Sequence, residues 1–314
     1  MLRKTITAIG CLFLSVYAYA YDYDFEVNGI YYRINSMEKM EAEVVSGEKK
    51  YSGNIAIPMT VSFREKEFKV VGIGTKSFRG CDITSVSIPD GVRYVDSWSF
   101  QNCCNLKNIE LPASLVGIGC SAFKNAGLTK IVIPNNVNQI LDSAFVNCSA
   151  AKSITIGKSV KSDGLPSTTF IGCSNVEELI ICDSKEELEI KCQARFMDNP
   201  ENYTFGPFRK LKRVYVGREL KPNYKNYIFR EDIEIEHLEL GRYVRYFLPW
   251  TMELKQITVH RKVPFVSDPS YRRQGDFTSK TKMNAVLYVP EGCVDLYKKA
   301  ELWKDFWTIK EIVK

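Results

Sequence analysis

The chain has few of the residues on which catalytic and metal sites usually depend. Only two histidines, His237 and His260, occur among its 314 residues, which leaves little for general-base catalysis or a zinc site. The motifs G-x-S-x-G, H-E-x-x-H and C-x-x-C are absent. The stretch "GIGTKS" at 72–77 resembles a phosphate-binding loop only superficially, because it lacks the third glycine. The sequence therefore predicts no enzyme, no cofactor and no metal, while an enzyme of unrecognised type stays open.

A long apolar run is also missing, except at the start of the chain. Residues 1–20 carry two basic residues, then a short apolar stretch, then "AYA" directly before Tyr21. This order predicts a signal peptide with Tyr21 as the mature N-terminus. The apolar stretch is too short to span a bilayer, and no later segment is longer, so we expect no transmembrane segment. The protein should be exported, either secreted or at the outer surface, with a periplasmic location still open.

A lipoprotein is the alternative interpretation of this first segment. The stretch "AIGC" at 8–11 loosely resembles a lipoprotein signal, which would make Cys11 a lipidated cysteine. However, Ala8 stands where leucine is usual, and apolar residues continue beyond Cys11. We therefore favour cleavage after Ala20 and treat the means of surface attachment as open.

Positive charge is not abundant, but it is unevenly placed. The net charge is +6, yet residues 201–314 hold 22 Lys and Arg against 15 Asp and Glu, whereas residues 21–200 hold 19 against 22. Basic clusters occur at 209–213, 242–246 and 271–273. Mixed-charge solvated faces produce such clusters routinely, so we predict no nucleic-acid partner.

What the chain does contain is an internal repeat. Phenylalanines recur at intervals of 22, 23, 22 and 25 residues, at Phe78, Phe100, Phe123, Phe145 and Phe170. The unit around each reads L-x-x-I-x-I-P, then a polar stretch, then I-G-x-x-A-F-x-x-C. Weaker copies follow Phe205, Phe229, Leu248 and Phe277, which gives about nine units with insertions at 183–204 and 261–276. Such a period predicts a solenoid.

The alternating I-x-I segment predicts one short strand per repeat, with both apolar residues on the buried face. Stacked copies would pair these strands into a parallel ladder and align the Phe, Ile and Leu columns in one continuous core. The proline that follows the strand in several copies has no N–H group to leave unpaired, so it can end the ladder.

With these repeats, roughly residues 55–314 resemble the BspA-like leucine-rich repeat family of exported bacterial surface proteins. The resemblance implies a leucine-rich-repeat solenoid, an α/β-type right-handed superhelix of mostly short parallel strands, irregular turns and little helix. It also implies β-hairpin caps over 21–69, repeats over 70–290 and a C-terminal cap over 291–314. That last cap should hold a short helix from about Val294 to Ala300 and a closing strand.

Residues that alternate with the buried strand positions form an outward face. Towards the C-terminus this face gains arginine, tyrosine and histidine, residue types that are enriched at binding hot spots or can stack and donate. The candidate binding residues are Glu110, Lys130, Arg213, Tyr215, His237, Glu239, Gln256 and Thr258. We expect this face to be concave and to bind a protein or a glycan.

Family resemblance supports the same function, because the family is associated with host-protein binding and adhesion. It does not identify a ligand or an oligomeric state. Two alternatives remain: each candidate residue is an ordinary solvent-facing strand residue, or the protein is a structural component of the bacterial envelope without a specialised ligand.

The cysteines follow the repeat. Cys81, Cys103, Cys148 and Cys173 each lie three residues after a repeat phenylalanine, and Ala126 takes this place in one unit. A position that accepts either cysteine or alanine is typical of core packing, so we predict largely free thiols. Export still leaves disulfides possible, for example between Cys81 and Cys103.

Overall fold

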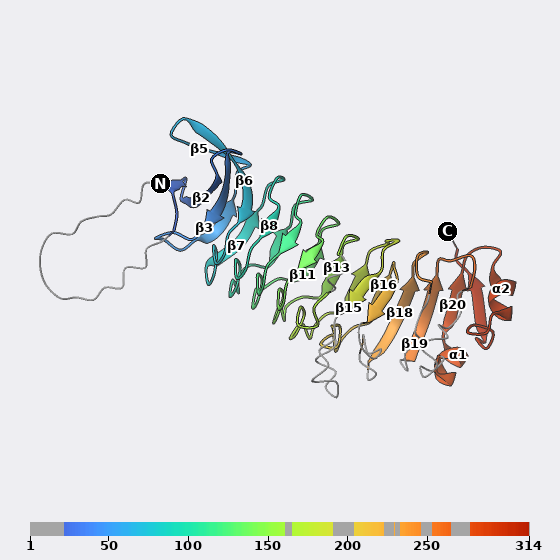
Figure 1. The fold of residues 1–314 in the computed structure, drawn as a ribbon. Coiled ribbons are helices and arrows are strands. Elements are labelled where there is room, and N and C mark those ends of the chain that lie inside the picture. Colours follow the sequence, from blue (N-terminus) through green and yellow to red (C-terminus); the bar gives the residue numbers. More distant parts are fainter. Residues whose placement is uncertain are drawn as a thin grey trace, which may run out of the picture.

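The computed structural model describes residues 22–160, 165–190, 204–222, 229, 233–245, 253–264 and 277–313. Figure 1 shows these residues as one elongated row of short strands, with the two ends of the described chain at opposite ends of the row. This is the predicted solenoid. The predicted signal peptide lies outside the described residues, and none of the helices within them is long and apolar enough to cross a membrane.

Antiparallel hairpins form the N-terminal cap, as predicted. The first hairpin turns at Asn28 and Gly29, whose φ angles of 52° and 78° suit a tight two-residue turn. Phe25 of this hairpin stacks on Phe63 of the second hairpin, with ring centroids 4.4 Å apart. The cap strands are β1 (Phe25–Val27), β2 (Ile30–Ser36), β3 (Glu41–Val45), β5 (Thr60–Phe63) and β6 (Lys66–Ile73).

The I-x-I segments form a row of parallel strands, which we call the main ladder; it is divided into two sheets, of three and eight strands, with no strand pairing across residues 111–129. It begins one rung earlier than predicted, because "IAIP" at 55–58 also fits the repeat unit and its strand pairs in parallel with the next one. The rungs are β4 (Ser52–Ala56), β7 (Asp82–Ser87), β9 (Asn108–Glu110), β11 (Lys130–Ile133), β13 (Ser153–Ile156), β14 (Glu178–Ile181), β16 (Arg213–Val216), β18 (Glu234–Leu240), β19 (Glu253–Val259), β20 (Val286–Val289) and β21 (Thr308–Glu311).

The prediction of one strand per repeat was wrong, because a second parallel ladder runs along the solenoid. Its rungs precede the repeat phenylalanines and continue the sheet of the cap strands β3 and β6. Most are two residues long, too short for any alternation of apolar and polar residues to reveal them. The added rungs are β8 (Tyr94–Val95), β10 (Gly117–Ile118) and β12 (Gln139–Ile140), and a further pair is β15 (Leu188–Ile190) with β17 (Leu220–Pro222).

The segment 183–204, predicted as an insertion, therefore contains part of the repeat. Ile190 of β15 bridges to Leu165 in parallel, and Leu165 lies five residues before Phe170 as the repeat unit requires. Leu165, Leu188 and Ile190 are fully buried. The described part of this segment thus supplies a rung of the second ladder rather than a loop.

The repeat phenylalanines stack into one column, which confirms the predicted core. Between Phe78 and Phe145, successive ring centroids are 5.0, 5.2 and 5.1 Å apart and the rings are within 5° of parallel. The column continues to Phe170 and Phe205 at 5.8 and 6.4 Å, with wider angles of 19° and 28°. All these rings are fully buried, so the column is continuous hydrophobic surface removed from water.

The cysteine column packs beside the phenylalanines. The thiols of Cys103, Cys148 and Cys173 approach main-chain carbonyls of the preceding repeat, with Sγ···O distances of 3.0, 3.2 and 3.3 Å. Burial raises the pKa of Cys103 to about 12. All eight described cysteines are free. Cys104, the neighbour of Cys103, is exposed and lies outside the column.

The corner of each regular repeat needs a left-handed backbone. The residue two places after the phenylalanine has a positive φ in every unit from Phe78 to Phe170, and it is always glycine or asparagine, the types that tolerate this region best. These residues are Gly80, Asn102, Asn125, Asn147 and Gly172. The asparagines also bond in a row, with the amide of Asn125 donating to Asn102 at 2.7 Å and that of Asn147 to Asn125 at 3.0 Å.

The C-terminal cap closes the other end of the core. The predicted helix is present as α2 (Val294–Lys299), and a second helix, α1 (Ser279–Asn284), was not predicted. Trp303 is fully buried and packs against Phe277 and Tyr297, with ring centroids 5.3 and 5.6 Å apart. β21 then adds the closing parallel strand beside β20.

Candidate functional site

The outward face of the main ladder consists of two rows of side chains. Register pairs Arg213 with His237 and His237 with Gln256 in one row, and Tyr215 with Glu239 and Glu239 with Thr258 in the other. Six of the eight candidate residues thus form a compact group on the adjacent strands β16, β18 and β19. Figure 1 shows these three strands in its yellow-to-orange part. We call this group the strand-face block; its members are Arg213, Tyr215, His237, Glu239, Gln256 and Thr258.

The other two candidates lie away from the strand-face block. Glu110 is on β9 and Lys130 is on β11, and the strands β13 and β14 separate β11 from β16. Both side chains are exposed. The structure therefore does not bring them together with the other six, although they belong to the same outward face.

The polar contacts of the strand-face block determine which of its side chains are free to contact a ligand. Arg213 is exposed and pairs with Glu178 on the neighbouring strand, with Nε 3.1 Å from Oε1. A solvent-exposed ion pair contributes little stability, so a ligand could bind this guanidinium with little loss of free energy from the broken ion pair. His237 is exposed and makes no side-chain hydrogen bond within the described residues. Gln256 donates to Thr258 at 3.3 Å, and Glu239 bonds to the ring of His260.

Tyr215 is held as a hydrogen-bond donor. Its hydroxyl donates to Asp183 Oδ1 at 2.8 Å. Partial burial, followed by this bond and the nearby negative charge of Asp183, raises the pKa of Tyr215 well above its usual value. The phenol therefore stays protonated at all physiological pH values, and it has no character of a general base.

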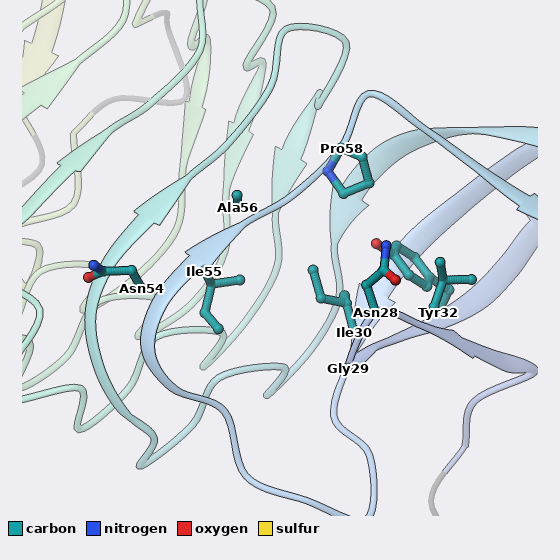
Figure 2. A pocket seen from close by; sticks show the side chains of 9 residues that line it. Asn28, Gly29, Ile30, Tyr32, Asn54, Ile55, Ala56 and Pro58 are labelled. Atoms are coloured by element: carbon teal, nitrogen blue, oxygen red, sulfur yellow. The ribbon is translucent and has the colours of Figure 1, made fainter.

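A small hollow near the N-terminal end offers no catalytic chemistry. Figure 2 shows it between the first hairpin, at Asn28 to Tyr32, and β4, at Asn54 to Ala56. Its volume is about 220 Å³. Tyr32 is its one titratable lining residue, and burial raises the pKa of that phenol to about 12. Nor does any cluster of three metal-ligating side chains occur among the described residues.

A second hollow, which we call the basic hollow, lies at the edge where β14, β18 and β19 end. Its volume is about 460 Å³, and its lining residues are Lys185, Arg242, Tyr243, Arg245 and Arg261. The sequence marks 242–246 as a basic cluster but gives no sign that Lys185 and Arg261 join it. They come together only because the turns after parallel strands meet at one edge of a sheet.

The sequence also gives no indication that Arg218 is buried. Arg218 is fully buried, and its guanidinium donates to the carbonyls of Gly157, Lys158 and Val160 at 2.9, 2.8 and 3.3 Å. Burial lowers its pKa to about 10, which still leaves it protonated near neutral pH. Arg218 thus ties the turn after β16 to the turn after β13, and its role is structural.

A comparison with protein-family models agrees with this architecture. Residues 71–199 match the model of the BspA type leucine-rich repeat region, in six copies. A search of curated proteins finds no match.

Three of the solved structures similar to the chain are described as leucine-rich repeat proteins. One from Bacteroides ovatus is 15% identical, with a TM-score of 0.36, and the match covers 93% of this chain and all of that one. One from T. pallidum is 20% identical, with a TM-score of 0.45, over 67% of this chain and 82% of that one. One from Bacteroides capillosus is 24% identical, with a TM-score of 0.36, over 41% of this chain and 95% of that one.

The six-copy match covers the units whose phenylalanines, cysteines and asparagines stack in columns. Over residues 71–199 the chain therefore matches a BspA-type leucine-rich repeat region within a strand-rich solenoid, which confirms the resemblance carried by the repeat unit over these residues.

Proposed function

We propose that the chain is a secreted or cell-surface interaction module that binds a protein or glycan ligand through the outward face of its main ladder. The strand-face block is the proposed contact, and no catalysis and no cofactor are involved. The leucine-rich repeat family supports a role in interactions at a surface, and the predicted signal peptide supports export. Fold alone does not fix a ligand, so the proposal depends on the block itself.

The observation that carries the proposal is the in-register placement of Arg213, Tyr215 and His237 on two neighbouring rigid strands. Tyrosine and arginine are enriched among the residues that dominate binding energies. The main chain of these paired strands is already ordered, so a ligand would pay only for ordering the side chains themselves. Further along the same face, β7 and β13 present small serine and threonine side chains.

The test compares two triple variants of the purified chain on a panel of immobilised extracellular-matrix proteins and glycans. The first carries Arg213→Ala, Tyr215→Ala and His237→Ala, and the second carries Ser85→Ala, Asn108→Ala and Ser153→Ala on the regular part of the same face. We expect the first variant to lose at least about tenfold in affinity for any ligand that the wild type binds. The second should bind as the wild type does.

Circular dichroism and thermal melting of both variants check that the ladder is intact. If the wild type binds no member of the panel, or if the first variant binds every ligand unchanged, the strand-face block is not the binding site. The absence of any binding would favour the structural envelope role instead.

A further inference from the structure

The basic hollow gathers four cations from three separate turns. Lys185 follows β14, Arg242 and Arg245 follow β18, and Arg261 follows β19. The turn after β18 packs so closely against its neighbours that its glycine, Gly241, has no room for a side chain. A Cβ on Gly241 would lie 2.6 Å from Asp183 Oδ1 and 2.8 Å from the Cα of Gly217.

The main chain around the hollow is fixed by hydrogen bonds. The N–H of Arg245 donates to a carboxylate oxygen of Glu219 at 2.8 Å. The hydroxyl of Tyr297 donates to the carbonyl of Arg261 at 2.7 Å, and the Arg261 guanidinium reaches the carbonyl of Val244 at 3.3 Å. Val244 itself is buried. A frame that is ordered before binding reduces the entropy lost when a ligand docks.

The side chains of the cations in the basic hollow differ from those on the strands in forming no ion pair within the described residues, although the main-chain N–H of Arg245 bonds to the carboxylate of Glu219. On the ladder, Arg213 pairs with Glu178 and Lys255 pairs with Glu234. In the part of the chain that the structure describes, none of the four cations of the hollow forms an ion pair. Like charges held together repel each other, so this arrangement leaves a local positive potential that a bound anion would relieve.

The residue types favour oxyanion groups on a small, ring-containing ligand. Guanidinium groups bind sulfate and carboxylate through paired N–H···O bonds, which makes arginine the preferred partner for planar or tetrahedral oxyanions. Tyr243 is half-buried among them and can pack against a sugar ring or donate from its hydroxyl. A hollow of about 460 Å³ falls within the range of small-molecule sites.

Acidic groups beside the hollow limit how far an anion can extend. Asp183 and Glu239 lie on the adjoining turn and strand, and Asp183 is exposed. A nucleic-acid backbone needs a groove of continuous positive charge, and these carboxylates would interrupt it. A compact anionic group avoids them. The predicted export of the chain also favours a ligand outside the cell.

We propose that the basic hollow is a binding site for an acidic saccharide, one whose sugar residues carry sulfate or carboxylate groups. The three arginines bind these groups, Lys185 adds a fourth positive charge, and Tyr243 contacts the ring. This proposal rests on the proposed function for the extracellular location of the site. It deepens that function because it names a ligand class for the edge of the sheet region that contains the strand-face block.

The experiment measures binding of a heparin-derived tetrasaccharide to the purified chain by calorimetry. The variant Arg242→Gln with Arg245→Gln should bind at least about tenfold more weakly, because each arginine contributes charge-assisted hydrogen bonds. The matched variant Arg79→Gln with Lys49→Gln changes net charge equally at exposed positions elsewhere, and it should bind within about twofold of the wild type. A fully desulfated, N-acetylated tetrasaccharide, whose carboxylates alone remain, should bind more weakly than the sulfated one.

Several results would overturn the proposal: no binding by the wild type, equal loss in both double variants, or equal affinity for the sulfated and desulfated sugars. Tighter binding of a single-stranded oligonucleotide of equal charge would assign the hollow to nucleic acid instead. The triple variant at Arg213, Tyr215 and His237 distinguishes a failure of this proposal from a failure of the proposed function. It should keep its affinity for the tetrasaccharide whether or not the strand-face block has a ligand of its own.

Discussion

The regular repeats and the C-terminal repeats of this solenoid use the same strand ladder in different ways. From Phe78 to Phe145 the rings stack at nearly constant spacing and within 5° of parallel, whereas Phe170 and Phe205 are 6.4 Å apart and inclined by 28°. The regular repeats have left-handed corners in every unit. In the described part of the chain between residues 173 and 291, no residue has a positive φ.

The outward faces of the regular repeats and the C-terminal repeats also differ. Of the regular strands, β7 and β13 present mainly small polar side chains and β9 and β11 add Glu110, Lys130 and Val132, while β16, β18 and β19 carry the strand-face block and the turns beyond β14, β18 and β19 carry the basic hollow. Where the core columns are most uniform, the surface is least distinctive. The regular repeats therefore have the most uniform core, and both proposed binding sites lie where the repeat pattern departs from its consensus.

The largest expected effect comes from cutting the phenylalanine column in its regular part. Phe123→Ala removes a fully buried ring that stacks on both Phe100 and Phe145. We expect the free energy of unfolding to fall by about 4 kcal/mol, from lost burial and the cavity left behind. Chemical denaturation followed by circular dichroism measures this change.

The control for this prediction is Val132→Ala, a change on the outward face of the next strand, where Val132 is 42% exposed. It should alter the free energy of unfolding by less than about 0.5 kcal/mol. If the two substitutions had similar effects, the column would not be the stabilising feature and the contrast between the two parts of the solenoid would fail.

The second largest expected effect concerns the contact between the regular repeats and the C-terminal repeats. Arg218 lies in the C-terminal repeats, yet its three hydrogen bonds go to the turn after β13. Arg218→Ala leaves three main-chain carbonyls without this donor, and we expect a loss of about 3 kcal/mol in the free energy of unfolding. Arg218→Lys should lose less, because an ammonium can still reach some of these carbonyls but lacks the planar fork.

The comparison for Arg218 is Arg213→Ala, which removes an exposed ion pair and should change the free energy of unfolding by less than about 1 kcal/mol. Thermal melting of the three variants gives their order. Equal melting temperatures for Arg218→Ala and Arg213→Ala would mean that the buried arginine does not hold the two parts together.

Much of this architecture could be predicted from the sequence because the main ladder has a clear period. The Phe columns and the Cys103 position follow from spacing and apolar alternation, whereas both caps were expected from the family resemblance. The second ladder could not be predicted, since rungs such as Tyr94–Val95 are only two residues long. The rung at "IAIP" was detectable from its motif alone, but it lies among the cap strands, where a hairpin was expected.

The two proposed binding sites also differ in how far the sequence could predict them. The strand-face block could be predicted residue by residue, because alternation along a strand fixes which side chains point outward. The basic hollow could not, because Lys185 and Arg261 are 76 positions apart in the chain and meet only through the register of the four strands β14, β16, β18 and β19. Arg218 was missed because a charged residue is expected at the surface unless its partners are known.

The smallest expected effect concerns the left-handed corners that distinguish the regular repeats. Asn125 has a φ of 58° and stands in the asparagine row, where glycine takes the same place at residues 80 and 172. Asn125→Ala should lower the free energy of unfolding by about 1 kcal/mol, because alanine disfavours this backbone region. Asn125→Gly should be within about 0.5 kcal/mol of the wild type, since glycine accepts the region freely although it too loses the amide bonds.

A third variant separates backbone strain from lost hydrogen bonds. Asn105→Ala removes an exposed amide that donates to Asp82, at a position without a positive φ, and should have little effect. Denaturation midpoints of the three variants, measured side by side, give the answer. If alanine and glycine at residue 125 lowered the midpoint equally, the asparagine row would be stabilising through its side-chain bonds. In that case the contrast between the two parts of the solenoid would depend on a polar ladder rather than on backbone conformation.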